Sequence, residues 1–256
     1  MAEAPLRQWL EREGRLLRLR LARPKANILD AAMIAALDEA FARHAGSAGL
    51  AAVLVDHEGP NFSFGASVEE HLPERCAAML EALHALIGRM LEYPRPILVA
   101  VGGQCLGGGL EFALAGHLLF AAPDARFGQP EMNLAVFAPA ASVLLPLRAG
   151  QSRAEDLLYS GRSVDARTAL DWGLANEVTA DPAAAALAYF ERHLAGKSTS
   201  SLGFALRAAR GPFAELARLR LADVEALYLD ELMRTRDAAE GLQAFIDKRA
   251  PRYQDR

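Results

Sequence analysis

The stretch GQCLGGGLEFALAG (Gly103–Gly116) holds three consecutive glycines and a single carboxylate in otherwise apolar surroundings. The preceding PILVAV is typical of a buried strand, so the glycines open a helix whose first backbone N–H groups lack intrahelical partners. Glycines let a ligand approach such N–H groups closely, and the site favours negative charge. The ligand could be a phosphate, a dinucleotide or a developing oxyanion.

Two of these ligands fit the spacing poorly. No Gly-Lys-Ser/Thr follows the glycines, which argues against a phosphate loop. A dinucleotide site has Asp124 in its favour, at the end of the next predicted strand. However, contiguous glycines do not match G-x-G-x-x-G, and a helix over Gly108–Gly116 is short for a crossover. The oxyanion alternative requires a second N–H donor and a nearby acid or base.

Two glutamates could supply the acid and the base. Glu111 lies among apolar helix residues, where burial would raise its carboxyl pKa toward neutrality and suit it to proton transfer. The alternative is a side chain that points out of a partly exposed helix. Glu131, in RFGQPEMNLAVF, also follows apolar and turn residues. Two carboxyl groups in apolar settings can divide acid and base work between them.

The cysteines and histidines predict no metal or disulfide chemistry. Cys105 lies beside the glycines and could be a nucleophile, but a small buried filler is the favoured interpretation of a free cysteine. The six histidines show no ligand spacing. We therefore expect no metal site.

Alternating strand and helix patterns must position the glycines and the glutamates. Leu17, Leu19 and Leu21 alternate with arginines as in a half-buried strand, and Asp30 can cap the helix that follows. After Asp181 the chain shows helical patterns alone. Strands alternating with helices and followed by a helical tail predict an α/β architecture. A change in the sequence pattern near residue 195 divides the chain into a core, 1–195, and a helical C-terminal segment, 196–256.

The composition argues against several classes of protein. The chain has 256 residues, 52% of them hydrophobic and 23% charged, with a formal net charge of -4. An acidic balance argues against a general nucleic-acid binder, and no apolar run is long enough to span a membrane. The N-terminus lacks the apolar core of a signal peptide. We expect a cytoplasmic protein that binds neither nucleic acid nor membrane.

The central segment, GQCLGGGLEFALAGHLLFAAPDARFGQPEMNLAVF, resembles the signature of the enoyl-CoA hydratase/isomerase (crotonase) superfamily. The resemblance extends from LARPKAN near the start to GLQAFIDKR near the end. It implies a crotonase-like spiral of ββα units whose helical C-terminal region drives assembly into a homotrimer or a dimer of trimers. It also implies an acyl-CoA thioester as substrate, with coenzyme A as part of that substrate and no separate cofactor.

The resemblance assigns roles to four residues. The oxyanion hole falls on the backbone N–H groups of Ala66 and Gly108. Glu111 and Glu131 match the two glutamates of family hydratases, which favours hydration or its reverse. We assign water activation to Glu111 and carbon protonation to Glu131. The order stays open, because such a pair can titrate as a unit.

The resemblance also assigns the contacts to coenzyme A and substrate. Phe245 and Lys248 match family positions that reach coenzyme A, sometimes that of a neighbouring subunit; alternatively they belong to an ordinary terminal helix. His71 could touch the acyl group, although a surface or core-edge histidine is the favoured interpretation. The complete predicted set is Lys25, Ala26, Phe64, Ser67, Val68, Gly107, Phe137, Phe245 and Lys248.

Two departures from the family pattern narrow the expected substrate. FGAS replaces the usual AGAD, and AVFAPAAS (Ala135–Ser142) replaces GxxPxxGG, which implies a differently shaped acyl pocket. This combination resembles the family members that add water to a cyclic conjugated dienoyl-CoA in anaerobic benzoyl-CoA degradation. The alternatives are a generic enoyl-CoA hydratase, an enoyl-CoA isomerase using one glutamate, and a non-catalytic acyl-CoA-binding or RNA-binding protein.

Overall fold

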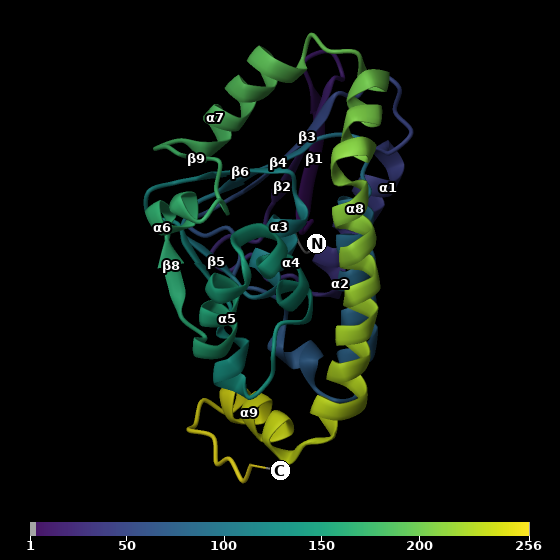
Figure 1. The fold of residues 1–256 in the computed structure, drawn as a ribbon. Coiled ribbons are helices and arrows are strands. Elements are labelled where there is room, and N and C mark those ends of the chain that lie inside the picture. The colour runs from purple at the N-terminus through teal and green to yellow at the C-terminus, as the bar shows by residue number, and fades with distance from the viewer. Residues whose placement is uncertain (1–3, 256) are drawn as a thin grey trace.

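The computed structural model describes residues 4–255, which form two β-sheets surrounded by helices (Figure 1). The larger sheet has six strands in the order β1-β2-β3-β4-β6-β9. Its first pair is antiparallel and the rest are parallel. The strands are β1 (Leu6–Glu11), β2 (Leu16–Leu21), β3 (Ala52–His57), β4 (Ile97–Val101), β6 (Leu118–Ala121) and β9 (Glu177–Val178).

The smaller sheet contains the strand that leads directly into the glycine-rich turn. It consists of β5 (Gln104–Leu106), β7 (Arg126–Gly128) and β8 (Ser163–Asp165), with β5 and β7 parallel. All five residues of β4 are buried, as expected for a parallel strand that is covered on both faces. β4 leads through β5 into the helix that carries the first glutamate.

The helices follow the predicted alternation, and the α/β fold class is confirmed. Asp30 caps α1, where its carboxylate accepts a hydrogen bond from the Met33 amide at 2.9 Å. The α-helices are α1 (Ala31–His44), α2 (Cys76–Leu91), α3 (Gly108–Ala115), α4 (Pro139–Ala149), α5 (Gln151–Ser160), α6 (Ala166–Asp171), α7 (Pro182–Tyr189), α8 (Thr199–Ala226) and α9 (Arg236–Ile246). Shorter helical segments are η1 (Val68–His71), η2 (Pro130–Leu134), η3 (Phe190–Leu194), η4 (Leu227–Glu231) and η5 (Leu232–Arg234).

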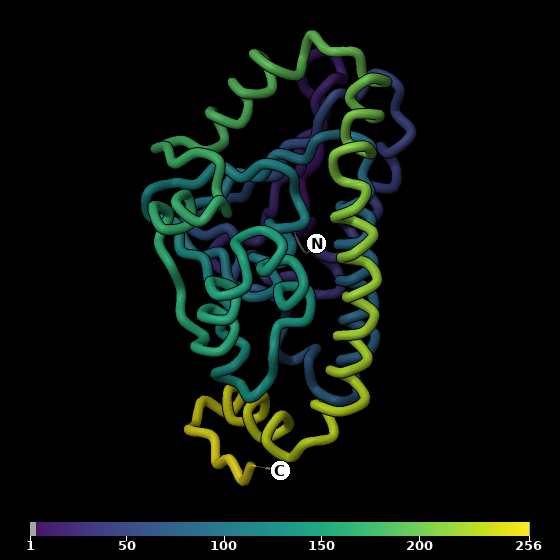
Figure 2. The backbone as a smooth tube through the Cα atoms, in the orientation of Figure 1, coloured from purple at the N-terminus to yellow at the C-terminus, as the bar shows by residue number. Residues whose placement is uncertain are grey.

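The C-terminal segment is helical, as expected, and it packs onto the rest of the chain. α8 runs along α2 and α4, and its residues Ala214, Ala217 and Leu221 belong to the main hydrophobic core (Figure 1). α9 closes the lower end of the molecule against η1 and η2 (Figure 2). A Cβ on Gly241 would lie 2.1 Å from the Leu134 carbonyl oxygen, so this close approach requires glycine. The packing places α9 over the end of η2, which carries the second glutamate.

Candidate active site

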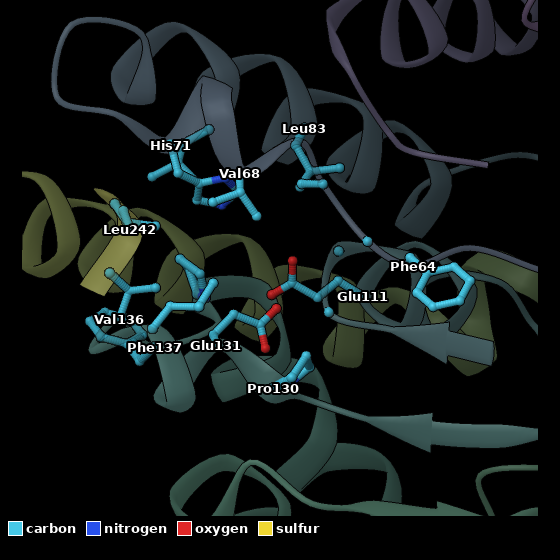
Figure 3. Close-up of a pocket in the computed structure, with 17 residues that line it drawn as sticks. Phe64, Val68, His71, Leu83, Glu111, Pro130, Glu131, Val136, Phe137 and Leu242 are labelled. Carbon is cyan, nitrogen blue, oxygen red and sulfur yellow. The ribbon is translucent and has the colours of Figure 1, made fainter. Parts of the chain in front are cut away.

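A small cavity of about 70 Å³ lies at the N-terminal end of α3. Its walls come from the loop before η1, from η1 itself, and from α2, α3, η2 and α9. Figure 3 shows the carboxyl groups of Glu111 and Glu131 turned toward each other across it. Phe64 lies at one end of this view, whereas His71, Phe137 and Leu242 gather toward the other. Residues far apart in the sequence therefore share one largely apolar pocket.

The turn into α3 accepts only glycine at its first position. Gly107 has φ +51° and ψ -132°, a conformation that side chains rarely adopt. A Cβ there would also lie 2.5 Å from Oε1 of Glu131. The glycine therefore serves the backbone turn and leaves room for the second carboxyl group.

The two predicted oxyanion-hole residues lie side by side. A Cβ on Gly108 would be 3.0 Å from the Ala66 amide nitrogen and 3.1 Å from its Cβ. A Cβ on Gly65, which has φ +105°, would be 3.3 Å from the Gly108 nitrogen. Within residues 4–255, neither the Ala66 nor the Gly108 amide donates a hydrogen bond to another protein group. Two neighbouring N–H groups are thus available to a ligand at the cavity.

Backbone pairing holds the Ala66 loop against the glycine turn. The Ser63 amide donates to Gln104 O at 2.9 Å, and the Leu106 amide donates back to Ser63 O at 3.0 Å. On the other side, the Leu29 amide donates to Gly65 O at 2.9 Å. These bonds hold the loop of Ala66 beside the start of α3, as a preorganised site requires.

Glu111 is buried, with 3% of its surface exposed, and the start of α4 supplies its hydrogen-bond donor. The Ala141 amide donates to Oε1 at 2.8 Å. Burial raises the pKa of Glu111 to about 7, against the opposing effect of the Ala141 and Ala140 amides. The carboxyl group is therefore poised near neutrality, as its apolar neighbours in the sequence predicted. The outward-pointing alternative is wrong, because α3 is buried along its length.

Glu131 projects from η2 and is partly exposed where it opens onto the cavity. Burial raises its pKa to about 8, and the nearby charge of Glu111 raises it further. The buried Gln129 side chain, with its amide nitrogen turned toward the carboxyl group, donates to Oε2 at 3.0 Å and to Oε1 at 3.2 Å. Since two close carboxylates repel each other, the pair holds one proton near neutral pH.

The remaining predicted contacts divide into two groups. Phe64, Val68, Gly107 and Phe137 line the cavity, whereas Phe245 and Lys248 lie outside it. The first group is continuous with the loop before α1, since the Phe64 amide donates to Ala26 O at 2.8 Å.

Lys25 adjoins Ala26 in that loop and adopts φ +91°. Ser67 adjoins the cavity through its carbonyl oxygen, which lies 2.7 Å from Nδ1 of His71. His71 is half-buried and lines the cavity, so it lies at the edge of the core in a position from which it could also touch an acyl group.

Several residues of the site escaped prediction. Ala141 donates to Glu111 through its backbone, Gln129 holds Glu131, and Leu242 lines the cavity from α9. Gln129 belongs to the FGQPE motif, and its position two residues before Glu131 is the feature from which its contact could have been predicted. Backbone donors and α9 packing leave no such trace in the sequence.

Cys105 is fully buried, and burial raises the pKa of its thiol far above neutrality. A protonated, inaccessible thiol is a poor nucleophile, which supports the filler interpretation.

Across residues 4–255, no three histidine, cysteine or acidic side chains come together as a metal site would need. In the same range, no helix combines the length and apolar character needed to cross a membrane.

The opposite end of α3 is bound by two arginines. Arg210 of α8 donates to Ala115 O at 2.7 Å and to Gly116 O at 3.1 Å. Arg148 of α4 donates to Leu114 O at 2.7 Å and also to Gly116 O. Burial lowers the pKa of Arg210 to about 9 and that of Arg148 to about 10. Cations at a helix C-terminus interact favourably with its carbonyl groups.

The chain belongs to the enoyl-CoA hydratase/isomerase family, whose model matches residues 11–256. It is therefore an enzyme, and its substrates are acyl-CoA thioesters. Both the predicted family and the crotonase fold class are confirmed. The solved enoyl-CoA hydratase/isomerase of Pseudoalteromonas atlantica T6c superposes with a TM-score of 0.84 at 31% identity, over 98% of this chain and 100% of that one.

Two relatives match nearly the whole chain. The chain is 60% identical over 255 residues to the cyclohexa-1,5-dienecarbonyl-CoA hydratase of Thauera aromatica, covering 100% of this chain and 99% of the relative. It is 33% identical to a probable enoyl-CoA hydratase of Bacillus subtilis strain 168, over 90% of this chain and 92% of that protein.

Proposed function

We propose that this protein adds water to cyclohexa-1,5-diene-1-carbonyl-CoA and forms 6-hydroxycyclohex-1-ene-1-carbonyl-CoA, as a step of anaerobic benzoyl-CoA degradation. The observation that carries the proposal is the pair of carboxyl groups, Glu111 and Glu131, which face each other beside two amides without a partner in the described part of the chain. The 60% identity to the Thauera aromatica hydratase supports the cyclic dienoyl substrate.

The Ala66 and Gly108 amides stabilise the thioester oxygen as charge develops on it. Water attacks the ring carbon β to the carbonyl, and the electrons of the double bond move to give a dienolate. Two fixed N–H dipoles in a small apolar cavity bind that oxygen more strongly than the neutral thioester. Loss of one such donor lowers turnover by roughly 10²- to 10³-fold.

The two glutamates move the protons. The ionised carboxylate removes a proton from water as its oxygen bonds to the β-carbon, and the protonated carboxyl group gives its proton to the γ-carbon. One O–H bond breaks, one C–O and one C–H bond form, and the ring keeps one double bond. The pair ends with one proton, as it began, but on the other glutamate.

We assign water activation to Glu111 and protonation of carbon to Glu131. The higher pKa of Glu131, about 8, favours its protonated form, while the Ala141 amide donates to the Glu111 carboxylate. Gln129 suits both states of Glu131, because a side-chain amide can donate to the anion or, turned over, accept from the acid. Hydrogen bonding thus holds each carboxyl group in place while the proton moves.

The coenzyme A moiety runs past Phe64, which is 44% exposed, along the loop that contains Lys25 and Ala26. Ser67, Val68 and Phe137 then surround the acyl end. Phe245 is 55% exposed on α9, and Lys248 follows that helix, so both side chains can reach a bound nucleotide from this chain or a neighbouring one.

We also propose that the C-terminal segment mediates self-association as a trimer or dimer of trimers. α8 and η4 expose large apolar side chains, which commonly mark protein interfaces. These residues are Phe204, Leu216, Leu219 and Leu227. Light scattering would give the mass of the wild type, and Leu219→Glu is expected to reduce it. A cytoplasmic location stays a prediction.

Turnover of the cyclic dienoyl-CoA, compared with crotonyl-CoA, tests the proposed substrate. We expect kcat/KM to be higher for the cyclic compound by roughly tenfold or more, with one water added per substrate. Preference for crotonyl-CoA would indicate a generic enoyl-CoA hydratase. Deuterium exchange without net hydration would indicate an isomerase.

A further inference from the structure

One end of the cavity is apolar except for His71. Its ring lies on the same wall as Val68, across from Phe137 and Leu242 (Figure 3). His71 is half-buried, and its side chain borders the cavity. The dienoyl ring of the proposed substrate carries no hydrogen-bond donor, so it offers the imidazole no partner.

The hydrogen bonds of His71 fix which ring nitrogen carries the proton. Nδ1 lies 2.7 Å from Ser67 O, and a carbonyl oxygen only accepts, so Nδ1 must donate. Burial lowers the pKa of His71, against the opposing effect of the Ser67 carbonyl, so the ring is neutral at neutral pH. Nε2 is then a hydrogen-bond acceptor, and no group within residues 4–255 pairs with it.

We infer that His71 is a specificity residue whose Nε2 accepts a hydrogen bond from the hydroxyl group that hydration adds to the ring. This inference rests on the proposed function. The dienoyl ring has no donor, whereas the product has one O–H group. The glutamates approach from α3 and η2, and His71 approaches from η1, so the new hydroxyl group is held between the two walls.

Competitive inhibition separates the product from a ring without a hydroxyl group. Inhibition constants would be measured against dienoyl-CoA hydration for 6-hydroxycyclohex-1-ene-1-carbonyl-CoA and for cyclohexanecarbonyl-CoA, which cannot be hydrated. In His71→Asn, the side-chain amide can still donate to Ser67 O but places no atom at Nε2. We expect the constant for the hydroxylated ligand to rise by about tenfold, the effect of one lost hydrogen bond. The constant for the saturated ligand should change by less than about twofold, within the scatter expected of a contact that is kept.

Two further variants sharpen the test. His71→Gln restores an acceptor near the Nε2 position and should recover part of the affinity for the hydroxylated ligand. Leu242→Val, an apolar change at the same end of the cavity, should shift both constants together.

Equal changes in both constants for His71→Asn, or no change in either, would overturn the role of His71 while leaving the proposed function intact. Absence of dienoyl-CoA hydration by the wild type would overturn the proposed function instead.

Discussion

The two ends of α3 are chemically opposite. At its N-terminal end, two amides that donate to no other group within residues 4–255 face a cavity with two carboxyl groups whose pKa values burial raises. At its C-terminal end, Arg148 and Arg210 saturate the last carbonyl groups and lie over the Phe213 ring, at 5.5 and 4.9 Å from its centre. The first end holds polar groups that a substrate must satisfy, whereas the second holds groups that the protein satisfies by itself.

Within the eight residues of α3, the groups that serve function therefore lie at one end and the groups that serve stability lie at the other. Buried carboxyl groups and unpaired amides lower the stability of the folded state, because water solvates them better than the cavity does. The arginine contacts stabilise the same helix, since removal of a donor would leave buried carbonyls without partners. Changes at the N-terminal end should therefore reduce activity, and changes at the C-terminal end should reduce stability.

Replacement of either glutamate should have the largest effect on activity. Glu111→Gln and Glu131→Gln should each lower kcat for dienoyl-CoA hydration by roughly 10²- to 10⁴-fold, the usual contribution of general acid–base catalysis. Steady-state kinetics on the two variants would measure this. Near wild-type turnover of both would exclude the proposed division of proton transfer.

A side chain at the oxyanion hole should have the next largest effect. A Cβ on Gly108 would lie 3.0 Å from the Ala66 amide nitrogen, so Gly108→Val would separate the two donors. We expect kcat to fall by roughly 10²- to 10³-fold with a smaller change in substrate affinity. Gly88→Ala, at a helical glycine with open space around it, is the matched control and should keep its activity. Full activity of Gly108→Val would contradict the proposed oxyanion hole.

The pH dependence of activity should reflect the carboxyl pair. With pKa values of about 7 and 8, one glutamate is ionised and the other protonated between these values. We expect a bell-shaped kcat/KM profile that falls below about pH 7 and above about pH 8. A profile that is flat from pH 5 to 9 would contradict this prediction.

Stability should fall over the pH range in which the carboxyl pair loses its protons. Because burial raises both carboxyl pKa values above the ordinary 4.5, the folded state binds more protons than the unfolded chain. Their contribution to stability is present below about pH 4.5 and is lost as the pH rises through about 8. Glu131→Gln should flatten this slope in denaturant titrations. An unchanged slope would argue against raised pKa values for the two carboxyl groups.

The smallest effect on activity is expected at the arginine end. Arg210→Met keeps much of the side-chain length but removes the donors to Ala115 O and Gly116 O. The free energy of unfolding should fall by about 1–3 kcal/mol, while kcat changes less than in the glutamate variants. Arg167→Met, at an exposed ion pair, is the matched control and should have little effect on stability. A fall in kcat as large as that of the glutamate variants, with an unchanged free energy of unfolding, would contradict the comparison between the two ends.

The sequence by itself determined those features of the site that depend only on residues adjacent in the chain. The strand before Gly107, the turn that requires glycine and the apolar setting of Glu111 are all contained in one short stretch. The FGQPE motif likewise marked Glu131, and the combined spacing identified the family. Such signals are readable because backbone geometry and burial pattern are local properties.

Only the tertiary structure decided how these pieces meet. The Ala141 amide reaches Glu111 from 30 residues away, Arg210 reaches Ala115 from 95 residues away, and Leu242 enters the cavity from α9. His71 became a cavity residue because η1 packs against α2 and α9. Backbone donors and long-range packing depend on the whole fold, and an alanine or leucine in a sequence gives no sign of them.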